Sequence, residues 1–536
     1  MKNMKYIALF LLSILMTGAT TPVKAANPIL PLWEFIPDGE PYVFEDPDNP
    51  GKYRVYLYGS HDILRDNYCG RDQVVWSAPV EDLNNWRFDG VIFRSIYDGM
   101  GRQLDSKGLA DVLYAPDVTY TTDANGKKTY YLYPNNQAWG RNGQVAKSDR
   151  PDGPFIACNW DKQDPRKSDG VLAFDPAVFV DDDGRVYGYW GFEKSNGAEL
   201  DPKTMATVKP GTKIVEDMIP NYKQPGVERF FEASSMRKIK DKYVFIYSRW
   251  TQDGEFGLPE TNYTLAYCYS NNPLGPFKYG GTIIDGRGKE PIGGGKYRVT
   301  ACPSGNTHGS ICEINGKWYV FYHRQSGNDE YSRQAMVAPI TVEVTEGPNG
   351  TVKISEGEYT SEGFELDGLN PLKRYPAGIA CYYTGPEPAH QEYPYVIYPG
   401  PYNEAHYADH YGDKDPYDAK INVSSVLHNT SGSVVGYKYF NFDKTYGKAG
   451  LKLSLNYVPE GLNGRMDIYV DRPSLKGGKK IGTLNISATK KNAVCEASIP
   501  VEALKQVKGK HALFFVFSSA VKGHSICQLK DFQFVN

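Results

Sequence analysis

The chain repeats one short pattern five times, and this repeat limits the folds that it can adopt more than any other feature. In each copy a polar residue opens an apolar strand, a tight turn follows, and a basic residue leads into a second strand rich in aromatic side chains. Turns of Asp, Asn and Gly between two such strands are typical of β-hairpins. The repeat therefore predicts an all-β chain with five hairpin units. The copies lie at 38–59, 117–133, 175–191, 232–248 and 308–323.

The spacing of the copies indicates how the hairpins are completed. They recur every fifty-five to eighty residues or so, which leaves room for the four strands of a propeller blade. We therefore expect residues 27–344 to form a five-bladed β-propeller. The first strand of each blade would line a central channel, so the polar residues that open the five copies should lie near one end of it. These residues are Asp38, Asp117, Asp175, Glu232 and His308.

The remaining sequence divides into two further parts. Residues 345–430 are rich in Gly, Tyr and Pro, and we expect them to be a connecting segment. Strand patterns resume over 431–536 with a spacing that suits a β-sandwich. This C-terminal part has no tryptophan, since all eight lie between Trp33 and Trp318.

The first 25 residues have the pattern of a secretory signal peptide. Lys2 and Lys5 precede an apolar stretch, and small residues follow it. We therefore expect a secreted or periplasmic protein. Later runs stay below the roughly 18 apolar residues of a membrane span, so none is expected.

The charge balance bears on the partners. A formal net charge of -3 and the lack of a long basic run argue against nucleic acid. A neutral ligand such as an oligo- or polysaccharide fits better. The sequence leaves the oligomeric state open.

Three of the five opening residues are carboxylic acids suited to hydrolysis of a glycosidic bond. That reaction needs a protonated acid for the leaving oxygen and an ionised carboxylate near the anomeric carbon. Glu232 follows Phe230 and Phe231, and burial against aromatic surface raises the pKa of a carboxylic acid, which favours Glu232 as general acid. Asp38 stands in a turn whose backbone donors could hold it ionised as the base that activates water. Asp175 would orient Glu232 and shift its pKa.

Five residues are candidates for substrate binding, several with an alternative role. Asp117 could contact the sugar or tie strands together. Arg333 could hold sugar hydroxyls or a carboxylate, or lie exposed in solvent. His61 could line the pocket or bridge two strands. Phe231 and Trp250 offer apolar faces to a sugar ring.

His308 has three possible roles. It could bind a metal ion on the channel axis, contact the substrate, or be a buried histidine with its hydrogen bonds satisfied. Its place in the repeat favours a central ion or water cluster. The chemistry itself requires no cofactor.

A set of short phrases resembles glycoside hydrolase family 43. The resemblance covers about three hundred residues, and it rests on the phrases at 27–38, 56–62, 77–86, 114–118, 174–184, 231–232, 308–309 and 322–323. It implies a five-bladed propeller and inversion of anomeric configuration, with Asp38 as base, Asp175 as pKa modulator and Glu232 as acid. It also implies that His308 is the axial histidine associated with a structural calcium ion, and that Arg333 faces the substrate.

Two features depart from the family pattern. The acid is commonly followed by Gly-Pro, whereas Ala233 and Ser234 follow Glu232 here. The base often precedes Pro, whereas Asp38 precedes Gly39. The C-terminal strands resemble a family 6 carbohydrate-binding module in which sugar stacking would fall to tyrosines.

The sequence thus predicts an exo-acting, inverting glycoside hydrolase. Its expected product is a terminal pentose, α-L-arabinofuranose or β-D-xylose, released from plant polysaccharide. Release of terminal galactose or galactofuranose is the alternative within the family. A sugar-binding propeller without catalysis is the alternative from another class.

Overall fold

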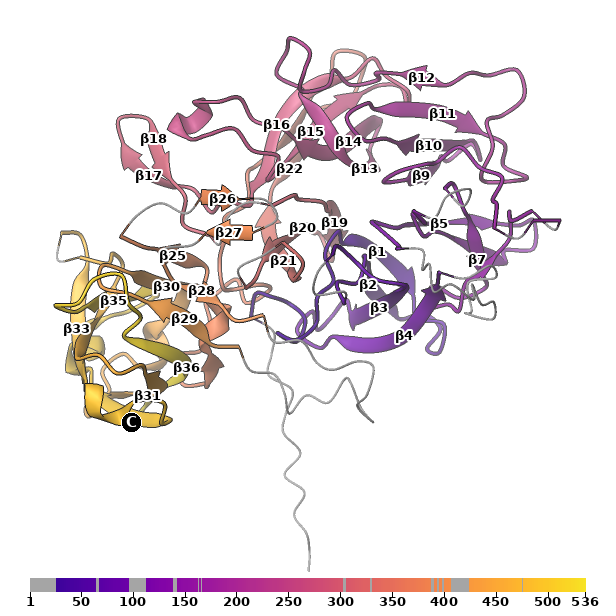
Figure 1. The fold of residues 1–536 in the computed structure, drawn as a ribbon. Helices are drawn as coiled ribbons and strands as arrows, with labels where there is room; N and C mark the ends of the chain where they lie inside the picture. Colours follow the sequence, from indigo (N-terminus) through magenta and orange to yellow (C-terminus); the bar gives the residue numbers. More distant parts are fainter. Residues whose placement is uncertain are drawn as a thin grey trace, which may run out of the picture.

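The structure is a computed structural model that describes residues 26–536 except 64–66, 96–111, 138–141, 162, 165, 302–304, 328–329, 387–389, 393–394, 398–399, 406–423 and 475. Across these residues the regular elements are β-strands and short 3-10 helices, so the all-β prediction is confirmed. Figure 1 shows the strands gathered into several small sheets. The predicted signal peptide lies outside the described residues.

Five antiparallel sheets follow one another along the first part of the chain, and each contains one of the predicted hairpins. The first two contain β1 (Glu40–Glu45), β2 (Tyr53–Tyr58), β3 (Asp72–Pro79) and β4 (Arg87–Arg94), then β5 (Asp117–Thr122), β6 (Lys128–Tyr133), β7 (Ala146–Ser148) and β8 (Ile156–Ala157). The third contains β9 (Ala177–Val180), β10 (Val186–Trp190), β11 (Asn196–Leu200) and β12 (Val215–Glu216). The last two contain β13 (Phe230–Ile239), β14 (Lys242–Arg249), β15 (Thr264–Ser270) and β16 (Lys278–Asp285), then β19 (Ser310–Ile314), β20 (Lys317–Gln325) and β21 (Arg333–Ile340).

Aromatic side chains of the second strands pack between neighbouring sheets. Tyr56 of β2 and Tyr130 of β6 share one buried cluster with Phe44 of β1. β14 is buried along its whole length, which explains the apolar and aromatic run over 243–247 at its centre. Two short hairpins lie outside the five sheets, β17 (Glu290–Gly293) with β18 (Lys296–Arg298) and β22 (Val342–Val344) with β23 (Val352–Ile354).

The first strands of the five sheets contact one another in series. A hydrogen bond from Tyr42 to Asp117 joins β1 to β5, and β9 packs against both β5 and β13. The hydroxyls of Ser235 and Ser310 lie 2.8 Å apart between β13 and β19. β19 packs against β1, beside a parallel bridge from Gly309 to Gly39. The residues that precede these strands are therefore brought to one place.

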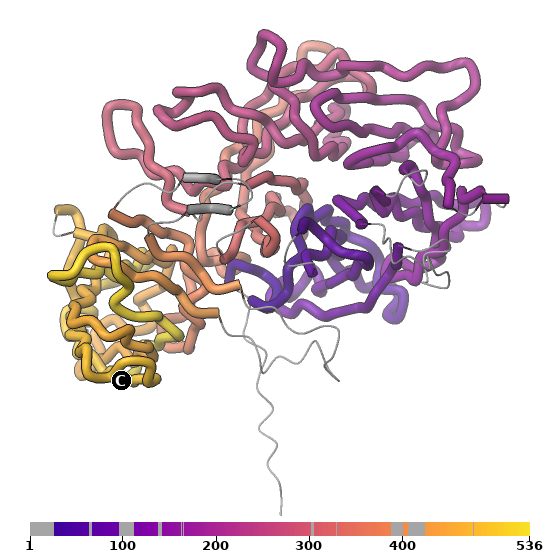
Figure 2. Tube along the Cα trace, in the orientation of Figure 1, coloured from indigo at the N-terminus to yellow at the C-terminus, as the bar shows by residue number. Residues whose placement is uncertain are grey.

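The C-terminal part contains two antiparallel sheets that share one hydrophobic core. One is built from β24 (Tyr375–Pro376), β28 (Tyr402–Asn403), β29 (Val426–Asn429), β31 (Lys452–Pro459), β34 (Cys495–Pro500) and β36 (Cys527–Val535). The other is built from β25 (Tyr382–Thr384), β30 (Val434–Asn441), β32 (Gly464–Val470), β33 (Lys479–Ile486) and β35 (Lys510–Ser518). A separate hairpin pairs β26 (His390–Glu392) with β27 (Tyr395–Ile397). The tube in Figure 2 shows the two-sheet part beside the first part.

The segment 345–430 differs from the expected connection. Its strands β24, β25, β28 and β29 belong to the two C-terminal sheets. These strands are only two to four residues long, too short for a clear alternation of apolar and polar residues. The short helices are η1 (Glu255–Gly257), η2 (Ala377–Ile379), η4 (Phe442–Lys444), η5 (Ala488–Lys490) and η6 (Glu502–Gln506). Within the described ranges, no helix has the length and apolar character needed to cross a bilayer.

Candidate active site

A cavity of about 530 Å³ opens where the loops of the first, third, fourth and fifth sheets meet, within the range of small-molecule sites. Its lining combines aromatic rings with polar groups, a composition that suits a sugar. The lining residues are Tyr68, Phe192, Phe231, Glu232, Trp250, Asn262, Gly305, Asn306 and Glu330. Of the predicted site residues, Glu232, Phe231 and Trp250 are among them.

Asp38 is buried and surrounded by groups that favour its ionised form. One carboxylate oxygen accepts a hydrogen bond from Ser60, and the other lies 3.1 Å from the Arg333 guanidinium. Burial alone would raise the pKa of Asp38, but the Arg333 charge, together with the neighbouring His323 and His308 and the Ser60 hydrogen bond, outweighs burial and lowers that pKa. Asp38 is therefore a carboxylate that keeps its negative charge inside the protein.

Arg333 is held in place by a second carboxylate. Its Nη2 and Nε atoms donate to the two oxygens of Asp62 at 2.8 and 2.9 Å, a bidentate geometry that fixes the guanidinium plane. Its Nη1 atom then donates to Asp38 and, at 3.3 Å, to Asn306 in the cavity wall. Arg333 is thus buried and bound to the expected base, which differs from a solvated surface arginine.

Asp175 lies beside Asp38 and Glu232 in the same cluster. Its oxygens accept hydrogen bonds from Asn135, at 3.0 Å, and from the backbone N–H of Ala233, at 2.9 Å. Burial, followed by the charge of Asp38, raises the pKa of Asp175 to about 8. The bond to Ala233 ties Asp175 to the residue that follows Glu232, so Asp175 fixes the local backbone of the expected acid.

Glu232 is a member of the cluster whose surroundings favour its protonated form. Burial raises its pKa well above the ordinary value, and the neighbouring charges of Asp175 and Asp38 raise it further. Asp38 and Glu232 are therefore two nearby carboxyl groups with opposite protonation at neutral pH.

Three of the five opening residues occupy equivalent positions. Asp38, Asp175 and His308 each stand two residues before the first strand of their sheet. Asp38 and Asp175 adopt left-handed φ values of 61° and 44°, which are sparsely populated by residues other than glycine. Glu232 lies inside β13, at a bulge in its pairing with β14. Each of the three carboxyl groups therefore stands at a local distortion of the backbone.

Asp117 occupies a different layer. It opens β5 itself, accepts hydrogen bonds from the Tyr42 hydroxyl and the Val178 backbone N–H, both at 2.6 Å, and joins three sheets. It does not line the cavity described above. The geometry matches the interstrand tie that the sequence left open as an alternative.

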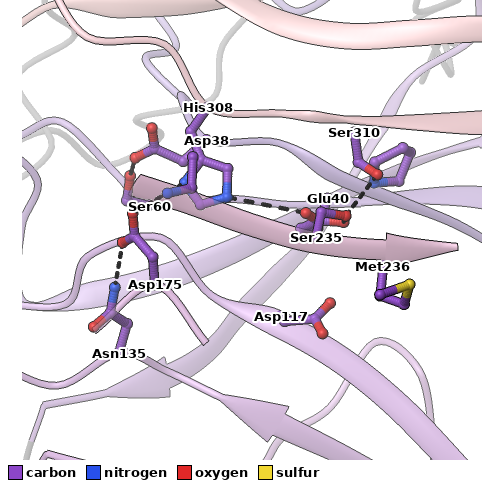
Figure 3. A network of polar contacts seen from close by, with 12 residues as sticks. Asp38, Glu40, Ser60, Asp117, Asn135, Asp175, Ser235, Met236, His308 and Ser310 are labelled. Carbon is purple, nitrogen blue, oxygen red and sulfur yellow. Dashed lines mark hydrogen bonds and ion pairs between the residues drawn. The ribbon is translucent and has the colours of Figure 1, made fainter. Parts of the chain in front are cut away.

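His308 lies between the carboxyl cluster and this second layer, as Figure 3 shows. Its Nδ1 atom is 3.6 Å from an oxygen of Asp175, and its Nε2 atom is 4.0 Å from Oε1 of Glu40. Burial lowers the pKa of His308 to about 4, so the imidazole is neutral. Among the described contacts, neither this Nε2 atom nor this Oε1 atom has a hydrogen-bond partner.

His61 bridges two carboxylates outside the cavity lining. Its ring nitrogens lie 2.8 Å from Asp72 and 3.1 Å from Glu34. Burial lowers the pKa of His61, but Glu34 and Asp72 outweigh that effect and raise it to about 10. The structure therefore places His61 in a buried ionic tie.

Several residues of the site carried no signal in the repeat. Most of them follow the second strand of a hairpin. Because the two strands are antiparallel, the end of the second strand lies beside the start of the first, where the opening residue stands. A search of the residues just after each second strand would have found them. They are Ser60, Asp62, Asn135, Phe192 and Glu330.

Comparisons with known proteins relate this chain to a family and to individual relatives. The model of the family described as glycosyl hydrolases family 43 matches residues 54–346. A xylosidase/arabinosidase from Thermoclostridium stercorarium is 31% identical over 528 residues, covering 94% of this chain and 98% of that protein. An arabinoxylan arabinofuranohydrolase from Paenibacillus polymyxa is 24% identical over 524 residues, covering 94% of this chain and 72% of that protein. A solved family 43 arabinoxylan arabinofuranohydrolase from Bacillus subtilis is 20% identical, covers 96% of this chain and 98% of that chain, and has a TM-score of 0.44.

Proposed function

Because this chain belongs to glycosyl hydrolase family 43, we propose that it releases a terminal pentose, α-L-arabinofuranose or β-D-xylose, from plant polysaccharide. The observation that carries the proposal is the pair formed by an ionised Asp38 and a protonated Glu232 in one buried cluster. The choice of sugar is supported by the names of the relatives, a xylosidase/arabinosidase and an arabinoxylan arabinofuranohydrolase.

The proposed reaction inverts the anomeric carbon. Asp38 accepts a proton from a water molecule, and the water oxygen bonds to the anomeric carbon as the glycosidic bond breaks. Glu232 donates its proton to the leaving oxygen in the same step. Arg333 and Ser60 hold Asp38 ionised, and Asp175 fixes the backbone beside Glu232.

A panel of aryl pentosides and galactosides tests this function. We expect release of arabinose or xylose, and NMR should show that the first product has the anomeric configuration opposite to that of the substrate. A first product with retained configuration would contradict the inverting mechanism. Release of galactose or galactofuranose alone would favour the alternative hydrolase, and sugar binding without any hydrolysis would favour a non-catalytic propeller.

The proposal includes the architecture and location of the protein. The series of contacts among β1, β5, β9, β13 and β19 supports a five-bladed propeller over residues 27–344. The two sheets that share a core support a C-terminal sandwich of the carbohydrate-binding-module type. The pattern of residues 1–25 supports export, to the periplasm or outside the cell.

The proposal also includes a calcium ion near His308. His308 and Glu40 would hold it, because Nε2 of His308 and Oε1 of Glu40 are buried and have no hydrogen-bond partner among the described contacts. Calcium takes roughly six to eight mainly oxygen ligands. In the described part of the chain no three His, Cys, Asp or Glu side chains are grouped to hold a metal.

Thermal unfolding tests the ion. The melting temperature of the wild type should fall in EGTA and recover with calcium. The melting temperature of His308→Ala should be the same in EGTA as with added calcium. A wild type that is insensitive to EGTA would contradict this part of the proposal.

A further inference from the structure

A turn after β10 holds one half-exposed aromatic ring at the cavity. Phe192 lines the cavity and is 50% exposed, unlike the buried Phe231 beside it. Exposed apolar surface is unfavourable in water, and the half-buried ring would gain free energy if its open face were covered. An aromatic ring that lines a cavity beside polar groups suits a bound sugar that would cover its open face.

The backbone of this turn is fixed on both sides of the ring. Gly191 donates to the Phe174 carbonyl at 2.8 Å, and Glu193 donates to the Phe231 carbonyl at 2.6 Å. Glu193 has a left-handed φ of 56°, a conformation that costs free energy for such a residue. A Cβ atom on Gly191 would lie 1.8 Å from the Lys194 carbonyl oxygen, so only glycine fits there. The chain thus tolerates local strain to keep Phe192 in one position.

Neighbouring rings also fix the orientation of the Phe192 ring. Phe174 and Phe231 contact it at centroid distances of 5.3 and 5.1 Å, with interplanar angles of 63° and 61°. These are the edge-to-face arrangements that aromatic pairs prefer. Phe231 continues the contacts to Trp250 at 4.8 Å. Because the ring is already ordered, little conformational entropy would be lost when a ligand binds to it.

The position of the ring relative to Glu232 indicates which part of the substrate it meets. Phe192 packs on Phe231, which directly precedes Glu232. The general acid must lie within hydrogen-bond reach of the leaving oxygen. The aromatic wall therefore begins next to the general acid, on the leaving-group side. Asp38 is instead held by Arg333, which Asp62 binds.

We infer that Phe192 is a platform for the sugar ring on the leaving side of the cleaved bond. The enzyme then recognises an oligo- or polysaccharide through a second pyranose ring stacked on Phe192, in addition to the pentose that it releases. This inference rests on the proposed function and deepens it. It makes Phe192 a residue that determines preference for chain-linked over simple glycosides.

Substrates with and without a second sugar test the inference. One pair is xylobiose with methyl β-D-xyloside, and the other is arabinofuranosyl-xylobiose with methyl α-L-arabinofuranoside. For the pair that the wild type cleaves, Phe192→Ala and Phe192→Leu should lower kcat/KM on the oligosaccharide about tenfold, the effect of one lost stacking contact. The same variants should leave kcat/KM on the methyl glycoside within about twofold. Phe192→Tyr, which keeps a flat ring, should retain oligosaccharide activity.

Tyr53→Ala is the matched control, since Tyr53 is 48% exposed at the start of β2 and does not line the cavity. This change should alter kcat/KM on neither the oligosaccharide nor the methyl glycoside. Equal losses on both substrates in Phe192→Ala would assign the ring a structural role and overturn the inference, as would an unchanged oligosaccharide rate. If the wild type cleaves neither pair, the proposed pentosidase function itself fails, a result distinct from a selective failure of Phe192.

Discussion

At the scale of single residues, two carboxyl groups in one cluster are driven to opposite protonation states. Asp38 is surrounded by donors and by the Arg333 charge, and its pKa is lowered. Glu232 is buried near Asp38 and Asp175, and its pKa is raised. Burial acts on both groups in the same direction, so the local partners decide which one becomes the acid.

Removing the proton of Glu232 should stop catalysis without unfolding the protein. In Glu232→Gln the side chain keeps its size but cannot protonate the leaving oxygen, so kcat should fall by about a hundredfold or more. Hydrolysis of the natural substrate, with circular dichroism as a check of folding, measures this. Glu313→Gln, on an exposed acid of β19, is the control and should keep full activity. An unchanged rate in Glu232→Gln would remove Glu232 from the mechanism.

Glu232 should also give stability a pH dependence of known sign. Its folded pKa lies above the ordinary value of 4.5 for a glutamic acid, so the unfolded chain releases this proton at lower pH than the folded chain. Stability is therefore lost as pH rises above 4.5 and through the raised folded pKa. Glu232→Gln removes this loss, and its melting temperature should exceed that of the wild type by more at pH 8 than at pH 5. A gap that is constant or reversed with pH would count against the raised pKa.

At the scale of elements, carboxylates at the start of the first strands join neighbouring sheets. Asp117 binds the backbone of β9 at Val178, and Asp175 binds the backbone of β13 at Ala233. The two bonds are alike in chemistry but lie in different layers. Of the two, Asp175 has Glu232 beside its bond. The bond of Asp117 therefore supports the packing of the sheets, whereas the bond of Asp175 supports the active site.

Asp117→Ala should reduce stability and leave substrate affinity unchanged. The change strips partners from two donors, the Val178 N–H and the Tyr42 hydroxyl, at a cost of roughly 2–4 kcal/mol for two groups. Urea unfolding measures the loss, and KM at a permissive temperature should equal that of the wild type. Asp117→Asn, which keeps one acceptor, should lose less. A raised KM with normal stability would instead indicate a sugar contact.

At the scale of the whole molecule, the C-terminal sheets are bonded to the sheet that carries Arg333. Arg324 of β20 is buried and donates to the carbonyls of Ala380 and Gly378, at 2.7 and 2.5 Å. It pairs in register with Gln334, the residue next to Arg333. Arg324, which bonds the two parts, is thus paired across the sheet with the residue next to Arg333, and Arg333 holds Asp38.

Arg324→Met should weaken this joint. Two buried carbonyls lose their donor, so we expect a loss of roughly 2–4 kcal/mol and a calorimetric transition that broadens or splits. Arg472→Met is the matched control, because its side chain is 55% exposed and its bond to Glu290 should contribute less than about 1 kcal/mol. Equal, small effects of both changes would show that Arg324 does not couple the two parts.

The sequence by itself determined the all-β class and the hairpins, because alternation, aromatic strands and turn residues are local properties. It also singled out the carboxyl groups of the cluster, because a repeated pattern gives equivalent residues equivalent places. That argument was weakest where the local backbone differed from copy to copy. Asp117 stands two residues further along than Asp38, and this shift moves it into another layer.

Only the tertiary structure decided what each side chain meets. The bidentate hold of Asp62 on Arg333, the ionic tie of His61 and the exposed ring of Phe192 all depend on residues distant in the sequence. The short strands of 345–430 likewise form because distant strands satisfy their backbone hydrogen bonds. Hydrogen bonding, burial and pKa depend on these neighbours in space, which a local pattern cannot specify.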